Sequence, residues 1–412
     1  ASGFYTVTTI ADSGAGSLRQ AIVDANADAI GPSLTIYFDS ALSGTIVLAS
    51  PLPELNNASG FSITIDGYTA MGAAVNTDLK KFNGTVTVEI DGTALTGSES
   101  ALTISGIGCL VKGLAINRCG NGPGTTAISI GGAVCSVEGC LIGTDLTGTA
   151  VPSPANVYGI RITGANNRVG DTFDAARNVI SGCSIAGVLI SGASNNSIYE
   201  SLIGTDKDGA GPLPNDTGIL INTGAADNSV IGNVISGNTT GLAINGVGTV
   251  RTAALGNLIG LTADGALALA NGTGVLLSNG TTSNVIGVGE GSGNVISGNN
   301  TGVQIQDSGT SFNTVLNNTI GLRQDETAAV GNMTGVGISS NASDNLIGGT
   351  AGSDGNLISG NTVGIAIDGA FTDNNRVEGN KIGTDPAGVM SIGNMTGVLI
   401  TSGPKNNVIG GT

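Results

Sequence analysis

The chain has 412 residues, of which 70 are glycine and only 11% are charged, and its formal net charge at pH 7 is −16. This negative charge argues against nucleic acid as a partner, because binding phosphates requires clustered Lys and Arg, and no apolar run approaches the roughly 20 residues needed for membrane insertion. The mean hydropathy is nevertheless positive, +0.27, so the aliphatic side chains must be hidden in a continuous interior.

The first predicted element is a short helix over residues 17–26, SLRQAIVDAN. Ser17 followed by Gln20 matches the capping-box pattern of a helix N-terminus. A short amphipathic helix before a repeat array is expected to cover the first open repeat. We therefore expect residues 1–34 to form an N-terminal strand and capping helix. Its apolar face should comprise Leu18, Ala21, Ile22 and Ala25.

Two similar tetrapeptides, TIDG and EIDG, follow and contain Asp66 and Asp91. Their separation is close to one repeat length, which predicts that the two carboxylates are stacked turn residues of consecutive coils.

The five cysteines all lie in the first half of the chain, form no CxxC pair and have no histidine partner, so common Cys/His zinc sites are excluded. Cys109 and Cys135 hold equivalent places in CLVKGL and CSVEGC, and a disulfide between them is one alternative. The other alternative is that all five thiols are small buried fillers of the repeat. In that case Cys140 replaces a repeated Asn, and Cys119 and Cys183 take the last place of the ISGN turn.

The phrase GNVISGN returns along the chain, together with short strands of the type Gly-apolar-x-apolar. Successive Gly-apolar-x-apolar strands are about 25–33 residues apart, and two further short strands lie between each strand of this type and the next. Three short strands per repeat, broken by Gly and Asn, predict an all-β parallel β-helix (β-solenoid). About 13 coils are expected to form a single domain over residues 35–412, with regular two-coil repeats from about residue 126 onward.

Alternation within these strands predicts which side chains face the interior. In 302-GVQI-305, for example, Val303 and Ile305 should stack inward while Gln304 faces outward. Asn side chains at equivalent corners are expected to form an amide ladder along the axis. The predicted ladder consists of Asn233, Asn257, Asn294, Asn318, Asn356 and Asn380.

The segment 5-YTVTTIADSGAGSLRQAIVDANA-27 resembles the CSLREA-type N-terminal segment of secreted bacterial β-helix proteins, with Gly16 and Gln20 in place of the Cys and Glu of that motif. The repeats resemble right-handed parallel β-helix proteins of cell surfaces and secretions. This resemblance covers essentially the whole chain and implies right-handed coiling and a secreted, extracellular or cell-surface location. It implies no particular activity, because pectin-degrading enzymes, adhesins and tail spikes share the scaffold.

A longer loop follows every second coil, and the loops should form a ridge. Carboxylates beside turn carbonyls are ligands that Ca²⁺ prefers, but Asp beside Gly also commonly caps a turn. The spacing matches neither the nonapeptide of calcium-binding β-rolls nor an EF-hand. The candidate calcium ligands are Asp145, Asp206, Asp208 and Asp385.

Three functions remain open at this point. The leading expectation is a non-enzymatic structural β-solenoid, acting as an adhesin, spacer or fibre subunit that associates with further copies of itself. The alternatives are a polysaccharide lyase or hydrolase, which needs converging acid and base groups, and a carbohydrate- or calcium-binding stalk, with a surface glycan as partner. We expect no catalytic residue and no cofactor other than Ca²⁺.

Overall fold

The computed structural model describes residues 3–288 and 293–410. The chain divides into two compact units. The first unit contains Ala1–Asp208 and Leu213–Asp216, and the second contains Gly209–Pro212 and Thr217–Thr412. Both units are built almost entirely from parallel strands arranged in three sheets, which confirms the predicted parallel β-helix.

In the first unit, each turn of the chain from Ser62 onward contributes strands to sheets A, B and C in succession, whereas the described turns before it contribute none to sheet C. Sheet A contains, in spatial order, β1 (Gly3–Val7), β2 (Ser33–Phe38), β4 (Ser62–Asp66), β7 (Leu110–Lys112), β10 (Ser136–Glu138), β13 (Arg168–Val169) and β16 (Ser197–Tyr199). Sheet B contains β3 (Gly44–Val47), β5 (Val88–Asp91), β8 (Ala115–Asn117), β11 (Leu141–Ile142), β14 (Val179–Ile180) and β17 (Leu202–Ile203). Sheet C contains β6 (Ser100–Ile104), β9 (Thr126–Ile130), β12 (Tyr158–Ile162) and β15 (Ala186–Ser191).

The second unit repeats the same three-sheet pattern. Within this unit, sheet A has β19 (Ser229–Ile231), β22 (Ala253–Leu255), β25 (Val285–Ile286), β28 (Thr314–Val315), β31 (Leu346–Gly348), β34 (Arg376–Glu378) and β37 (Val408–Ile409). Sheet B has β20 (Val234–Ile235), β23 (Leu258–Ile259), β26 (Val295–Ile296), β29 (Thr319–Ile320), β32 (Leu357–Ile358) and β35 (Lys381–Ile382). Sheet C has β18 (Thr217–Asn222), β21 (Thr240–Asn245), β24 (Thr273–Ser278), β27 (Thr301–Gln306), β30 (Thr334–Ser339), β33 (Val363–Asp368) and β36 (Thr396–Thr401).

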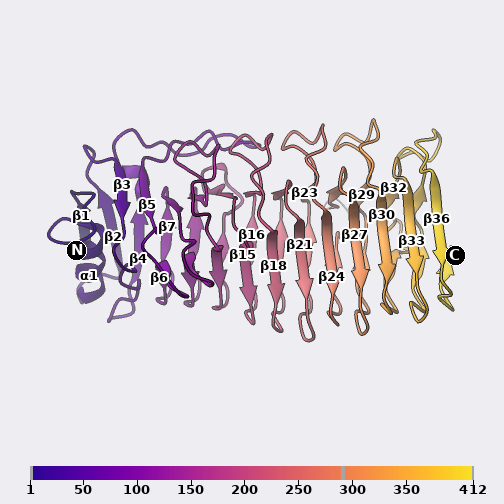
Figure 1. Ribbon diagram of the computed structural model, residues 1–412, viewed down its shortest axis with the longest axis horizontal. Coiled ribbons are helices and arrows are strands. Elements are labelled where there is room, and N and C mark those ends of the chain that lie inside the picture. Colours follow the sequence, from indigo (N-terminus) through magenta and orange to yellow (C-terminus); the bar gives the residue numbers. More distant parts are fainter. Residues whose placement is uncertain (1–2, 289–292, 411–412) are drawn as a thin grey trace. The chain divides into compact units, whose positions relative to one another are not determined.

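The predicted helix forms as α1, Leu18–Ala27, with Ser17 as its N-cap. The Ser17 hydroxyl accepts the N–H of Gln20, and the four predicted apolar side chains are the buried ones. Helix α1 contacts β1 and β2, beside which it lies in Figure 1. Two single-turn 3₁₀ helices, Gly67–Thr69 and Asp174–Ala176, complete the described helices, none of which is long and apolar enough to cross a membrane.

The interior of each coil is aliphatic, as the alternation predicts. In β27, Val303 and Ile305 have no exposed surface, whereas Gln304 faces outward. Ile305 is aligned with Leu277 of β24 and Ile338 of β30, so these side chains form a column through neighbouring coils. The neighbouring strands β24, β27, β30 and β33 are visible in sequence order in Figure 1.

Amide ladders fix the corners of the coils. In the predicted ladder of the second unit, each Asn donates from Nδ2 to Oδ1 of the next Asn at 2.8–3.1 Å. The second unit contains two further ladders that were not predicted. One contains Asn238, Asn271, Asn299, Asn332, Asn361 and Asn394, and the other contains Asn284, Asn313, Asn345, Asn375 and Asn407.

Candidate functional site

The four aspartates predicted as calcium ligands lie in the outer loops. In the first unit, Oδ1 of Asp145 accepts the N–H groups of Thr149 and Ala150 at 3.2 and 3.3 Å. In the second unit, Oδ1 of Asp385 accepts those of Val389 and Met390 at 2.7 and 3.0 Å, and these hydrogen bonds lower the pKa of Asp385. Both carboxylates therefore close the turn that contains them.

Asp206 and Asp208 lie in one turn, where Oδ1 of Asp206 accepts the N–H of Asp208 at 3.1 Å. Their loop contacts the loop of Asp145, because the N–H of Lys207 donates to the carbonyl of Gly148 at 2.9 Å. Over residues 3–288 and 293–410, no three His, Cys, Asp or Glu side chains are grouped to hold a metal ion. Calcium binding at these aspartates remains a prediction.

The predicted stacking of Asp66 and Asp91 is wrong. Asp66 ends β4 in sheet A and is aligned with Lys112, whereas Asp91 ends β5 in sheet B and is aligned with Asn117. The 3₁₀ helix and the excursion that follow Asp66 occupy about as many residues as a full coil, so the spacing imitates one repeat. Each carboxylate does accept the N–H two residues ahead, as expected of a turn residue.

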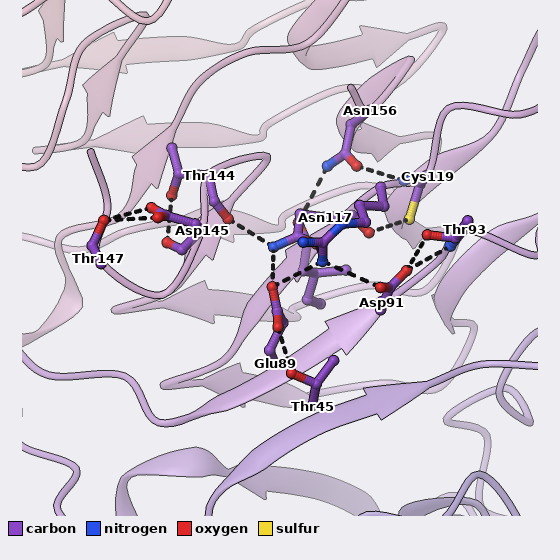
Figure 2. A network of polar contacts seen from close by, with 12 residues as sticks. Thr45, Glu89, Asp91, Thr93, Asn117, Cys119, Thr144, Asp145, Thr147 and Asn156 are labelled. Atoms are coloured by element: carbon purple, nitrogen blue, oxygen red, sulfur yellow. Dashed lines mark hydrogen bonds and ion pairs between the residues drawn. The ribbon is translucent and has the colours of Figure 1, made fainter. Parts of the chain in front are cut away.

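A polar network covers part of the outer face of sheet B in the first unit, and Figure 2 shows Glu89 between Thr45 and Asn117. Glu89 accepts from Thr45 Oγ1 at 2.6 Å and from Asn117 Nδ2 at 2.7 Å. The guanidinium of Arg118 lies 3.2 Å from both Glu89 and Asp91, which joins the two carboxylates. Because Glu89 is only 7% exposed and both its oxygens accept hydrogen bonds from neighbouring strands and turns, this network stabilises the sheet.

A second charged group lies on the outer face of sheet A. Asp66, Lys112 and Glu138 are aligned side by side on β4, β7 and β10. Lys112 Nζ is 2.9 Å from Asp66 Oδ2. Burial, followed by the nearby charge of Asp171, raises the pKa of Glu138. A half-buried carboxyl with a raised pKa beside an ammonium can exchange a proton with a bound substrate, so we name these three residues the sheet A triad.

The sheet A triad was not predicted, although the sequence contained a signal for part of it. The same alignment that matched Cys109 with Cys135 also matches Lys112 with Glu138 in CLVKGL and CSVEGC. Opposite charges at one outward position of consecutive coils must lie close together in a parallel β-helix. Asp66 was interpreted only as a turn residue, so its partner was missed.

The five cysteines are buried free thiols, which favours the filler alternative. Cys140 takes a ladder position, where its N–H donates to Asn178 Oδ1, and Cys119 and Cys183 donate in the same way to Asn156 and Asn215. Burial raises the pKa of Cys119 and Cys140 to about 12 and also raises that of Cys183. A hydrogen bond from Cys135 lowers the pKa of Cys109 to about 7, so Cys109 ionises first in that pair.

The raised thiol pKa values predict that the first unit loses stability in alkali. Above the ordinary thiol pKa of 9, the unfolded chain releases protons that the folded chain keeps until about pH 12. The free energy of unfolding should therefore fall between these values by about 1.4 kcal/mol per pH unit for each such thiol. Urea unfolding at a series of pH values measures this slope. Cys183→Asn, which installs the usual ladder residue, should reduce the slope, and an unchanged slope would contradict the assignment.

Comparisons with known proteins support the fold. No family model and no curated protein matches the sequence. The solved Dettilon tailspike protein has a TM-score of 0.54 at 16% identity, covering 94% of this chain and 65% of the tailspike, so this chain spans just under two thirds of the tailspike's length. The A-module of Azotobacter vinelandii mannuronan C-5 epimerase AlgE4 has a TM-score of 0.49 at 16% identity, and the match covers 99% of this chain and 96% of that module. DFA-IIIase from Arthrobacter chlorophenolicus A6 has a TM-score of 0.46 at 14% identity, and the match covers 100% of this chain and 94% of the DFA-IIIase chain. At these identities the similarity concerns the fold alone, which is that of parallel β-helix proteins.

Proposed function

We propose that the chain is a non-enzymatic structural β-solenoid of a cell surface or secretion, acting as a spacer, adhesin or fibre subunit. The observation that supports this proposal best is the triple amide ladder of the second unit, which fixes all three corners of successive coils. Each ladder Asn bonds both to its neighbour and to backbone carbonyls, so the polar corner residues serve the scaffold. The CSLREA-like segment is consistent with export.

This proposal predicts that the protein does not degrade pectin, alginate or inulin, with or without Ca²⁺. Such turnover needs an acid and a base that reach the scissile bond, whereas the charged groups of the sheet B network are bonded to one another. Reducing-end and unsaturated-end assays over prolonged incubation test this, with boiled protein as the control. Products above that control would overturn the structural proposal.

A polysaccharide-processing enzyme is the second candidate, and the sheet A triad is the observation that favours it. In such an enzyme, Glu138 with its raised pKa would supply a proton and Lys112 would stabilise developing negative charge. If any polysaccharide is turned over, Lys112→Met and Glu138→Gln should abolish the activity. Lys81→Met, at an exposed loop position of the same unit, is the matched control and should retain it.

Self-association is part of the structural proposal. The last outer loop of the second unit exposes Val389, Met390 and Met395 by 83%, 68% and 85%, and such apolar surface favours contact with a further copy of the chain. We expect sedimentation velocity to show concentration-dependent association. The double substitution Val389→Ser with Met390→Ser should weaken it. A single monomeric species at all concentrations would remove the fibre-subunit role and leave a monomeric spacer or adhesin.

A further inference from the structure

Successive outer loops are joined by one recurring backbone hydrogen bond. In the first unit, the N–H of Lys207 donates to the carbonyl of Gly148 at 2.9 Å. In the second unit, Ala263 donates to Gly209 at 2.9 Å and Gln324 donates to Gly265 at 3.1 Å. The same loop position is the donor each time, and the same later position is the acceptor.

The acceptor position requires glycine for two reasons. Gly148, Gly209 and Gly265 all have a positive φ, between 64° and 71°. A Cβ atom there would also lie 2.9 Å or less from Cβ of the donor residue in the next loop. Close stacking of the loops therefore leaves no space for a side chain at this point.

The last step of the repeat in the second unit departs from this pattern twice. Glu326 stands where the earlier loops have glycine, and it keeps the left-handed backbone with φ of 59°. Pro386 stands where the donor should be, and proline has no N–H to give. Both departures prevent the close stacking seen between the earlier loops.

A cavity of about 230 Å³ lies at this step, and we name it the loop cleft. Glu326 and Lys381 both line it. Glu326 is held by the hydroxyl of Thr319, which donates to Oε1 at 2.7 Å, and Lys381 Nζ donates to the carbonyl of Pro386. The remaining lining includes Asn317, whose Nδ2 donates to the carbonyl of Val288 at 3.1 Å, and Ser353.

We propose that the loop cleft binds one neutral pyranose ring of a glycan. Sugar hydroxyls both donate and accept, so the hydroxyls of one ring can donate to Glu326 and accept from Lys381. The carboxylate and the ammonium balance each other in charge, and the amide and hydroxyl groups of the lining suit an uncharged polar ligand. The volume lies below the range of about 300–1,000 Å³ typical of larger ligands, which favours one ring.

This inference is independent of the proposed structural role, because a spacer or an enzyme could equally have such a site. Saturation-transfer NMR on the intact chain can test it with glucose, galactose, mannose and N-acetylglucosamine. Glycine betaine serves as a zwitterionic probe, since a zwitterion would also match one carboxylate and one ammonium.

Two variants restore the loop repeat and should close the cleft without harming the fold. Glu326→Gly removes the side chain from a position that favours glycine, and Pro386→Ala returns the missing N–H donor. Lys381→Gln removes the ammonium alone. Lys405→Gln, at an exposed lysine outside the cleft lining, is the charge-matched control.

We expect at least one sugar to bind the wild-type chain. Its affinity should fall at least tenfold in the three cleft variants and stay unchanged in Lys405→Gln, with thermal midpoints no lower than wild type for Glu326→Gly and Pro386→Ala. Absence of sugar binding to the wild type would overturn the proposal. So would binding that survives both Glu326→Gly and Pro386→Ala, or binding of glycine betaine alone.

Discussion

Ile305→Asp is expected to unfold several coils of the second unit. Ile305 has no exposed surface and is aligned with Leu277 and Ile338 in a column of aliphatic side chains. A carboxylate at this point has no polar partner and cannot reach water, so the free energy of unfolding should fall by about 4 kcal/mol or more. Urea unfolding followed by circular dichroism measures the loss.

The neighbouring substitution Gln304→Asp supplies the matched control. Gln304 points out of the same strand, and its amide donates to the Ser339 hydroxyl at 3.0 Å. Losing this partly exposed bond should cost no more than about 1 kcal/mol. Equal destabilisation by the two variants would show that the assigned register of β27 is wrong by one residue.

Asn299→Ala should produce the second large loss of stability. Asn299 is 2% exposed and donates from Nδ2 to the carbonyl of Ile259 and to Asn332 Oδ1. Its own Oδ1 accepts the backbone N–H and the Nδ2 of Asn271. Alanine leaves these buried donors and acceptors without partners, which should cost about 3 kcal/mol in urea unfolding.

Asn300→Ala tests the same chemical change one residue later. Asn300 is exposed and lies outside the ladders, so this substitution should change the free energy of unfolding by no more than about 0.5 kcal/mol. Similar losses for the two variants would mean that the ladder adds no more to stability than any surface asparagine.

The repeat made the scaffold predictable from the sequence. Strict alternation around Gln304 identified the inward columns, because a one-residue slip would move every aliphatic side chain to the outer face. The repeated GNxI phrase led to the Asn294 ladder, since equivalent corners of a coil must stack. The ladders through Asn299 and Asn313 were missed, although both positions recur at more even spacings than those of the predicted ladder.

The candidate sites were harder to predict for a physical reason. Sequence spacing does not give position once an excursion interrupts the coil, and this is why Asp66 and Asp91 were misplaced onto one corner. Lys112 and Glu138 escaped notice because each looks like an ordinary surface charge until the strands are aligned. The loop cleft depends on Glu326 and Pro386 breaking a contact that only the structure reveals.

The Asn ladders also align the side-chain amide dipoles of the second unit in one direction. Every linking amide donates toward the C-terminal coil, from Asn233 to Asn257 and onward, and the other two ladders have the same sense. Hydrogen-bonded amides polarise one another, so these aligned dipoles add along each ladder. Deleting an amide in the middle of a ladder should therefore weaken bonds on both sides of it, whereas deleting one at an end weakens bonds on only one side.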